Sequence, residues 1–190
     1  MSCMKKIAIM FLLPLSLQAY TAKQNISISY FDEETVKFHL PNPPNFIKNR
    51  GRESVEKGMM IFYERKLLDL FTIMSGYSGC TLGRWTMKGD QIYTTSAFLS
   101  CRVWAIHLPF AHTYLEYSIL GPTLLSKENF NNVDFGSNIL FQNFFGAGIE
   151  LGEGRGFSIN LKILKYTNSD VNQPDVSIHI PILVSVGYLF

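Results

Sequence analysis

Apolar and polar residues alternate at every second position over most of the chain. In residues 157–166, for example, apolar side chains alternate with Ser158, Asn160 and Lys162. A period of two places successive side chains on opposite faces of a β-strand. Segments with this alternation, or with a β-prone apolar run, lie at 25–30, 58–65, 70–80, 92–106, 113–120, 135–151, 157–167 and 178–190. Turn-forming clusters separate these segments, so we expect an all-β fold with about eight strands.

The last segment carries the longest apolar face. Strict alternation places on one face Ile178, Ile180, Ile182, Val184, Val186, Tyr188 and Phe190, and on the other Ser177, His179, Ser185 and Gly187. A face of this length that ends in an aromatic residue is typical of a strand that contacts lipid. Charged residues make up only 17% of the chain, yet no apolar run reaches the roughly 20 residues of a membrane helix. We therefore predict an eight-stranded antiparallel transmembrane β-barrel of the outer-membrane type, with a soluble β-sandwich as the alternative.

The N-terminus has the features of an export signal. A basic pair, an apolar stretch too short to span a bilayer and a small residue follow one another in residues 5–19. This order is typical of a secretory signal peptide. We expect residues 1–19 to be removed, with cleavage after Ala19 or Ala22, and residues 20–190 to form the barrel.

Export would leave two cysteines, Cys80 and Cys101, in an oxidising compartment. The turn dipeptide Gly89-Asp90 lies about midway between them. If the flanking segments pair as a hairpin, the two cysteines lie almost opposite each other. The sequence therefore predicts either a disulfide between Cys80 and Cys101 or two buried free thiols.

Charge and histidine spacing exclude several function classes. The net charge is +2, and no cluster of lysines and arginines alternates with aromatic residues, so we expect no nucleic-acid partner. His39, His107 and His112 are dispersed without metal-ligand spacing. The sequence therefore predicts neither a metal nor another cofactor.

Strand parity gives the barrel an orientation. A barrel with an even number of strands has both termini in the periplasm, and short turns are usually periplasmic. The short turn at 152–156 then faces the periplasm, and the strand that follows it runs outward. Lys165, Thr167 and Asn168 are predicted at its extracellular end. Lys165 and Thr167 share the lipid-side face, beside the head groups of lipopolysaccharide.

The C-terminal half of the chain resembles the outer-membrane lipid A 3-O-deacylases of the PagL type, which are also grouped as acyloxyacyl-hydrolase-like proteins. The resemblance is carried by the segments 114–126, 134–152, 165–168 and 172–174 and by the terminal Phe190. It implies an eight-stranded barrel that cleaves the ester-linked acyl chain at the 3-position of lipid A. The implied active site lies on the outer wall at the outer-leaflet end. It also implies lipid A or lipopolysaccharide, the outer membrane and the barrel-assembly machinery as partners.

The family's chemistry is a serine nucleophile activated by a histidine, with a further residue that orients the imidazole. Its His-x-Ser-Asn pattern corresponds here to Lys165-Tyr166-Thr167-Asn168, and the orienting position falls on His179. Asn168 is retained as a candidate substrate contact. All three triad-equivalent positions, Lys165, Thr167 and His179, therefore differ from the family pattern.

Three interpretations follow from these changes. The first is a catalytically degenerate barrel, because threonine is a hindered nucleophile and a charged lysine has no acceptor for a proton. The second is an active esterase that uses Thr167 with Lys165 as the base, because lysine–hydroxyl pairs catalyse acyl transfer in other proteins. The third is a non-enzymatic structural or lipid-binding barrel.

Overall fold

The computed structural model describes residues 24–33, 52–87, 89–130, 133–152, 156–168 and 177–190. Its strands are β1 (Gln24–Asp32), β2 (Arg52–Ser54), β3 (Lys57–Phe71), β4 (Met74–Met87), β5 (Asp90–Leu108), β6 (Ala111–Leu120), β7 (Pro122–Leu125), β8 (Asn129–Phe130), β9 (Val133–Asp134), β10 (Ile139–Leu151), β11 (Gly156–Thr167) and β12 (Ser177–Leu189). The predicted signal peptide lies outside the described residues. None of the described residues belongs to a helix long and apolar enough to cross a membrane.

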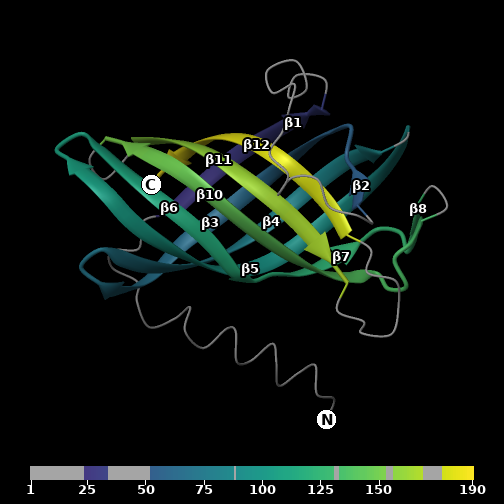
Figure 1. Ribbon diagram of the computed structural model, residues 1–190. Coiled ribbons are helices and arrows are strands. Elements are labelled where there is room, and N and C mark those ends of the chain that lie inside the picture. Colours follow the sequence, from purple (N-terminus) through teal and green to yellow (C-terminus); the bar gives the residue numbers. More distant parts are fainter. Residues whose placement is uncertain (1–23, 34–51, 88, 131–132, 153–155, 169–176) are drawn as a thin grey trace, which may run out of the picture.

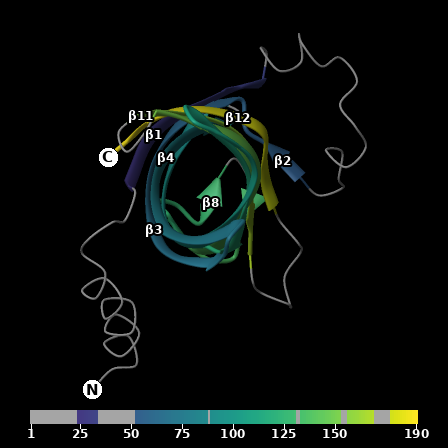
Figure 2. The same ribbon diagram turned by 90° about the vertical axis from the view of Figure 1, so that its left-hand side faces the viewer.

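The strands close into an antiparallel ring (Figures 1 and 2). The order around it is β1-β3-β4-β5-β6-β10-β11-β12, and β12 pairs with β1 to complete the circle. β7 continues β6 after a break at Gly121 and pairs with β5 and β10. Counting β6 and β7 as one, eight strands of the described chain form the wall, and each of the eight predicted segments contributes one. The predicted barrel is confirmed.

The two ends of the barrel differ. The connections β3–β4, β5–β6 and β10–β11 occupy only residues 72–73, 109–110 and 152–155, and all three lie at the end where Gly156 pairs with Leu189. We call this the turn end, and the opposite end the loop end. By the parity rule for outer-membrane barrels, the turn end faces the periplasm.

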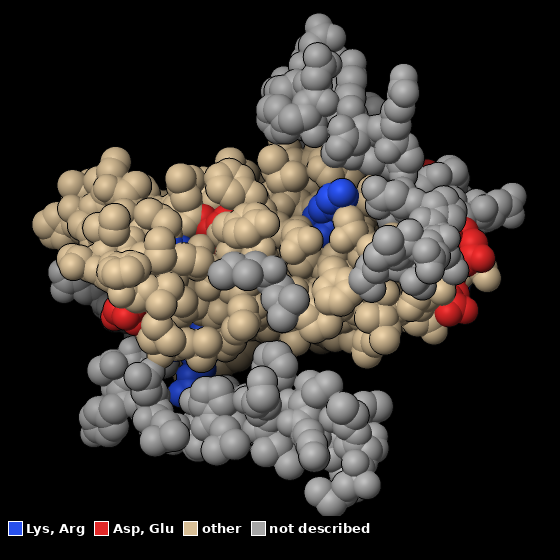
Figure 3. Space-filling model, turned by 60° about the horizontal axis from the view of Figure 1, so that its bottom comes forward, with Lys and Arg blue, Asp and Glu red and all other residues tan. Residues whose placement is uncertain are grey.

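Side chains alternate between a lipid-facing wall and a filled interior. Large exposed apolar residues on the wall include Ile26, Ile28, Met59, Ile61, Leu82, Leu115, Phe145, Ile159, Leu161, Val184 and Val186. Charged residues are sparse on the wall that Figure 3 shows. The outer surface therefore suits a hydrocarbon environment.

The interior has two layers. The loop-end half is an apolar core of Phe31, Val55, Met60, Phe62, Trp85, Met87, Ile92, Phe98, Leu125, Phe135, Leu140, Phe144, Leu164, Tyr166, Ile178, Ile180 and Leu183. The turn-end half is polar and contains the buried Asn25, Glu64, Ser100, Arg102, Glu116, Glu150, Asn160 and Lys162. The lumen is thus occupied by side chains along its length, as expected of an eight-stranded barrel.

The predicted alternation of the last strand is wrong at its loop end. Lys162 pairs with Leu183 but Leu164 pairs with Ile180, so a β-bulge places Pro181 and Ile182 opposite one residue of β11. Proline cannot donate to the strand ladder and is therefore tolerated at bulges. The extra residue reverses the side-chain parity. Ile178 and Ile180 are buried in the interior rather than facing lipid, whereas Val184, Val186 and Tyr188 face outward as predicted.

The predicted disulfide is also not formed. Cys80 and Cys101 are free, and neither thiol is fully buried. The hairpin between β4 and β5 exists, but Cys80 pairs with Ala97 and Cys101 with Gly76. The two cysteines are therefore offset by four residues, because the turn is centred earlier than the midpoint of the cysteines.

Candidate functional site

The three triad-equivalent positions lie together on the outer wall near the loop end. Lys165 and Thr167 are partly exposed on β11, and the buried Leu164 and Tyr166 alternate with them. His179 is partly exposed on β12, between the buried Ile178 and Ile180. The bulge in β12 produces this arrangement, because without it His179 would point into the lumen.

The strand register sets the spacing of the three side chains. Lys165 and His179 are direct partners across β11 and β12, and Thr167 is the partner of Ser177. Directly opposite residues have Cβ atoms about 4.5–5.5 Å apart, and diagonal neighbours are about 7–8 Å apart. Thr167 is the diagonal neighbour of His179. Both an amine and an imidazole therefore flank the threonine hydroxyl.

The hydroxyl of Thr167 has a partner on its other side. Thr167 Oγ1 donates a long hydrogen bond of 3.5 Å to the carbonyl oxygen of Phe141 on β10. This bond directs the proton of the hydroxyl toward β10, away from the strand that carries His179. As described, Thr167 is not in the hydrogen-bonded nucleophile–base arrangement that activates a hydroxyl.

Asn168 directly follows Thr167, the last residue of β11. Its Nδ2 atom is buried and has no hydrogen-bond partner within the described part of the chain. A buried amide donor without a partner is costly, so it is a natural point of contact for a ligand oxygen or a water molecule. The loop-end strand β2 runs parallel to β12 next to this region, with Ser54 in register with His179.

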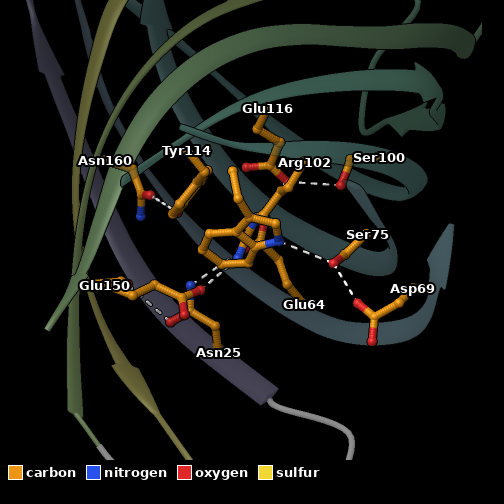
Figure 4. Close-up of polar contacts among 12 residues, drawn as sticks. Asn25, Glu64, Asp69, Ser75, Ser100, Arg102, Tyr114, Glu116, Glu150 and Asn160 are labelled. Carbon is orange, nitrogen blue, oxygen red and sulfur yellow. Dashed lines mark hydrogen bonds and ion pairs between the residues drawn. The ribbon is translucent and has the colours of Figure 1, made fainter. Parts of the chain in front are cut away.

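A second polar cluster lies inside the barrel, in the turn-end layer (Figure 4). Arg102 contacts three carboxylates: Glu64 at 2.5 Å, Glu150 at 2.9 Å and Glu116 at 3.4 Å. Lys162 contacts Glu64 at 3.0 Å and Glu116 at 3.2 Å. These five charged side chains are fully or almost fully buried. Buried charges persist only when they are paired in this way.

Aromatic residues complete the cluster. The guanidinium of Arg102 lies 4.1 Å from the ring centre of Tyr77 and 4.3 Å from that of Tyr114. Tyr114 in turn donates a hydrogen bond to Asn160. Glu116 lies on the inward face of β6, and its carboxylate contacts both Arg102 and Lys162. Nothing in the sequence singled out Arg102, although its position on the inward face of β5 follows from the alternation.

Comparison with known proteins gives matches to outer-membrane proteins. A family model described as lipid A 3-O-deacylase (PagL) matches residues 62–180. The crystal structure of the outer membrane enzyme PagL superimposes with a TM-score of 0.56 at 14% identity, and the match covers 88% of this chain and 98% of that one. The structure of the Yersinia pestis outer membrane protein Ail gives a TM-score of 0.42 at 12% identity. That match covers 89% of this chain and 99% of the Ail chain. No curated protein matches the sequence.

Proposed function

Because the chain belongs to the PagL family of lipid A 3-O-deacylases, we propose that it binds lipid A at the outer leaflet without hydrolysing it. The protein is an outer-membrane β-barrel, and its family match spans β11, the strand that carries both Lys165 and Thr167. Binding without hydrolysis explains why positions 165, 167 and 179 carry polar residues but not the residue types of the family's catalytic triad.

The observation that carries this proposal is the pairing of Lys165 with His179 on the lipid-facing wall. Lysine offers three donors and no acceptor when charged, so it suits a phosphate group better than a proton-abstracting role. The surface of a membrane with anionic head groups attracts a nearby lysine by about 1 kcal/mol. Lys165 therefore provides a phosphate contact where the family has a base.

The hydroxyl of Thr167 and the imidazole of His179 also suit binding of a lipid head group better than catalysis. Thr167 Oγ1 is engaged with the carbonyl oxygen of Phe141 rather than with a base. The position that orients the base in the family carries His179 here, which is not an acid. Together with the amide of Asn168, these groups can hydrogen-bond phosphate or sugar oxygens of a lipid head group. We also infer that the barrel-assembly machinery of the outer membrane inserts the protein.

A second candidate is an active esterase in which Thr167 is the nucleophile. The bulge in β12 favours it, because the bulge turns His179 outward to a position diagonal to Thr167. Either His179 or Lys165 would then remove the hydroxyl proton as Oγ1 attacks the ester carbonyl. The acyl chain would leave lipid A as a Thr167 ester and be released by water.

One assay separates the two candidates. The folded protein is incubated with lipid A, and released 3-hydroxy fatty acid is measured by mass spectrometry. We expect no release from the wild type, and release from the triple variant Lys165→His, Thr167→Ser, His179→Glu, which rebuilds the family pattern. Release by the wild type that is lost in Thr167→Val would overturn the non-hydrolytic proposal. Comparison of Lys165→Met with His179→Gln would then identify the base.

Binding is measured separately, by native mass spectrometry with added lipid A. Lys165→Met is expected to weaken binding about fivefold, the equivalent of one surface lysine contact. Arg84→Met is the matched control, because Arg84 is an exposed basic residue on the wall far around the ring, on β4. Equal weakening by both variants would show that Lys165 has no specific role.

A further inference from the structure

A second bulge re-aims another histidine, at the turn end of β5. Trp104 pairs with Tyr114 but Ile106 pairs with Thr113, so Ala105 is the extra residue. Past this bulge the side-chain parity of β5 is reversed. Ile106 is 55% exposed on the wall, and His107 shares the face of its partner His112 and lines the same cavity, with its side chain exposed at the rim.

The bulge creates a row of three metal-ligating residue types on adjacent strands. His107 on β5 is in register with His112 on β6, and His112 is in register with Glu150 on β10. The ring centres of the two histidines are 5.2 Å apart. Two nitrogens that ligate one Zn²⁺ at about 2.0–2.1 Å must lie roughly 3.3 Å from each other. Rotation of the two imidazoles toward each other brings their nitrogens to that spacing.

The row borders a cavity at the turn end. The cavity has a volume of about 370 Å³ and is lined by both histidines together with Tyr77, Trp104, Ser75 and Lys66, among others. Two lining side chains have unused polar atoms. The Nδ1 atom of His112 and the hydroxyl of Tyr77 are buried and have no hydrogen-bond partner within the described residues. The cavity therefore offers a ligand two unsatisfied polar groups.

The far wall of the cavity is held in place. Trp104 Nε1 donates to Ser75 Oγ at 3.0 Å, and Ser75 Oγ donates to Asp69 at 2.7 Å (Figure 4 shows the Ser75–Asp69 contact). The indole of Trp104 also contacts the rings of both histidines, at 5.9 Å and 6.3 Å between centres. The two imidazoles are thus positioned by a fixed aromatic neighbour.

The charge behind the cavity favours a cation. The buried cluster has three carboxylates, Glu64, Glu116 and Glu150, and two cations, Arg102 and Lys162. With these groups ionised, its net charge is two minus three, or −1. A negative charge in a poorly solvated interior attracts a positive ligand more strongly than it would in water.

We propose that His107 and His112 bind a divalent transition-metal ion of the Zn²⁺ class, which enters from the periplasmic side. The described residues contain no ready group of three or more histidine, cysteine, aspartate or glutamate ligands. The two imidazoles therefore supply the protein ligands, and water completes the coordination. Glu150, next in the row, supplies negative charge beside the ion. This proposal does not rest on the lipid A function.

Isothermal titration of metal-free folded protein with Zn²⁺ tests the site, with Mg²⁺ as the hard-cation control. We expect saturable binding of one Zn²⁺ per chain and none of Mg²⁺, because imidazole ligands select borderline metals. His107→Gln and His112→Gln are each expected to weaken binding by on the order of tenfold to a hundredfold. His179→Gln, which alters a histidine on the outer wall, is the matched control and should bind as the wild type does. Absence of Zn²⁺ binding, or unchanged binding in the double variant, would overturn the proposal.

A second measurement uses the wild type alone. Diethyl pyrocarbonate modifies accessible histidines, and mass spectrometry of the peptides locates the adducts. Zn²⁺ is expected to protect His107 and His112 while leaving His179 as reactive as before. Equal reactivity of the pair with and without Zn²⁺ would contradict the site even if the variants failed to fold.

Discussion

At the scale of single residues, Arg102 organises more of the interior than any other charged side chain described above. It lies between Glu64, Glu116 and Glu150 and is itself fully buried. Removal of one partner from a buried ion cluster leaves charges that have neither water nor a counter-ion. Removal of the Arg102 guanidinium would therefore leave three buried carboxylates without this counter-ion.

We predict that Arg102→Ala lowers the free energy of unfolding by about 3–5 kcal/mol, the usual cost of leaving a buried charge unpaired. Reversible urea unfolding in detergent micelles or lipid vesicles measures the change. Arg84→Ala is the control, since this exposed arginine on the same sheet should change stability by only about 0.5 kcal/mol or less. A difference between the two variants of less than about 1 kcal/mol would show that the cluster contributes little.

For single residues, the alternation of the sequence predicts on which face of a strand a side chain lies. Alternation correctly places Lys162 and Glu116 inside and Lys165 and Thr167 outside, because each lies on a regular stretch of strand. The partners of these residues could not be read from the sequence. Glu64 and Lys162 are 98 residues apart in the chain, and the closure of the ring between β12 and β1 brings their side chains to 3.0 Å.

At the scale of elements, the two bulges decide which side of the wall two histidines occupy. One extra residue at Ala105 turns His107 to the face of His112, and one at Pro181–Ile182 turns His179 outward. Counting by twos cannot locate an extra residue, so the predicted face of 178–180 was wrong. Pro181 was the available signal, because a proline within a strand marks an edge or a bulge.

Cysteine accessibility tests the β12 bulge directly. In a background with Cys80→Ala and Cys101→Ala, we predict that His179→Cys reacts with a small maleimide in micelles, whereas Ile180→Cys does not. His179 is partly exposed on the wall, and Ile180 is 0% exposed in the core. Val184→Cys, on the regular part of the outer face, is the positive control. A regular strand without the bulge would give the reverse, with position 180 reactive and position 179 protected.

The register of the β4–β5 hairpin explains why Cys80 and Cys101 do not form the predicted disulfide. The turn between β4 and β5 was predicted at Gly89-Asp90, one residue later than the register places it. The true centre lies two residues before the midpoint of Cys80 and Cys101, and this difference doubles to four in their register. Register follows from the turn geometry and from packing on both faces. A sequence pattern that locates a turn only to within a few residues therefore cannot establish a disulfide.

At the scale of the whole molecule, the interior is closed by two layers of different chemistry. In the loop-end layer, Phe62, Phe98 and Phe144 pack edge to face, with centres 5.1–6.1 Å apart. In the turn-end layer, Arg102 lies between the rings of Tyr77 and Tyr114. Alternation, composition and strand number predicted an eight-stranded transmembrane barrel. The division into an apolar and a charged layer required the three-dimensional register.

The two layers predict that the barrel carries no ions. Water would have to cross the layer of Phe62, Phe98 and Phe144, where the aromatic side chains are almost fully buried. The polar side chains at this level are buried too, and Thr81 and Ser96 both donate hydrogen bonds to Gln142. The folded protein should migrate anomalously in detergent gels unless heated, yet give no stepwise conductance in planar bilayers. Tyr77→Ala opens only the polar layer, so it too should not conduct, because the apolar layer of Phe62, Phe98 and Phe144 remains closed. Conductance steps from unheated, correctly migrating wild type would mean that the lumen is a pore. Steps from Tyr77→Ala alone would mean that the charged layer, rather than the aromatic one, forms the seal.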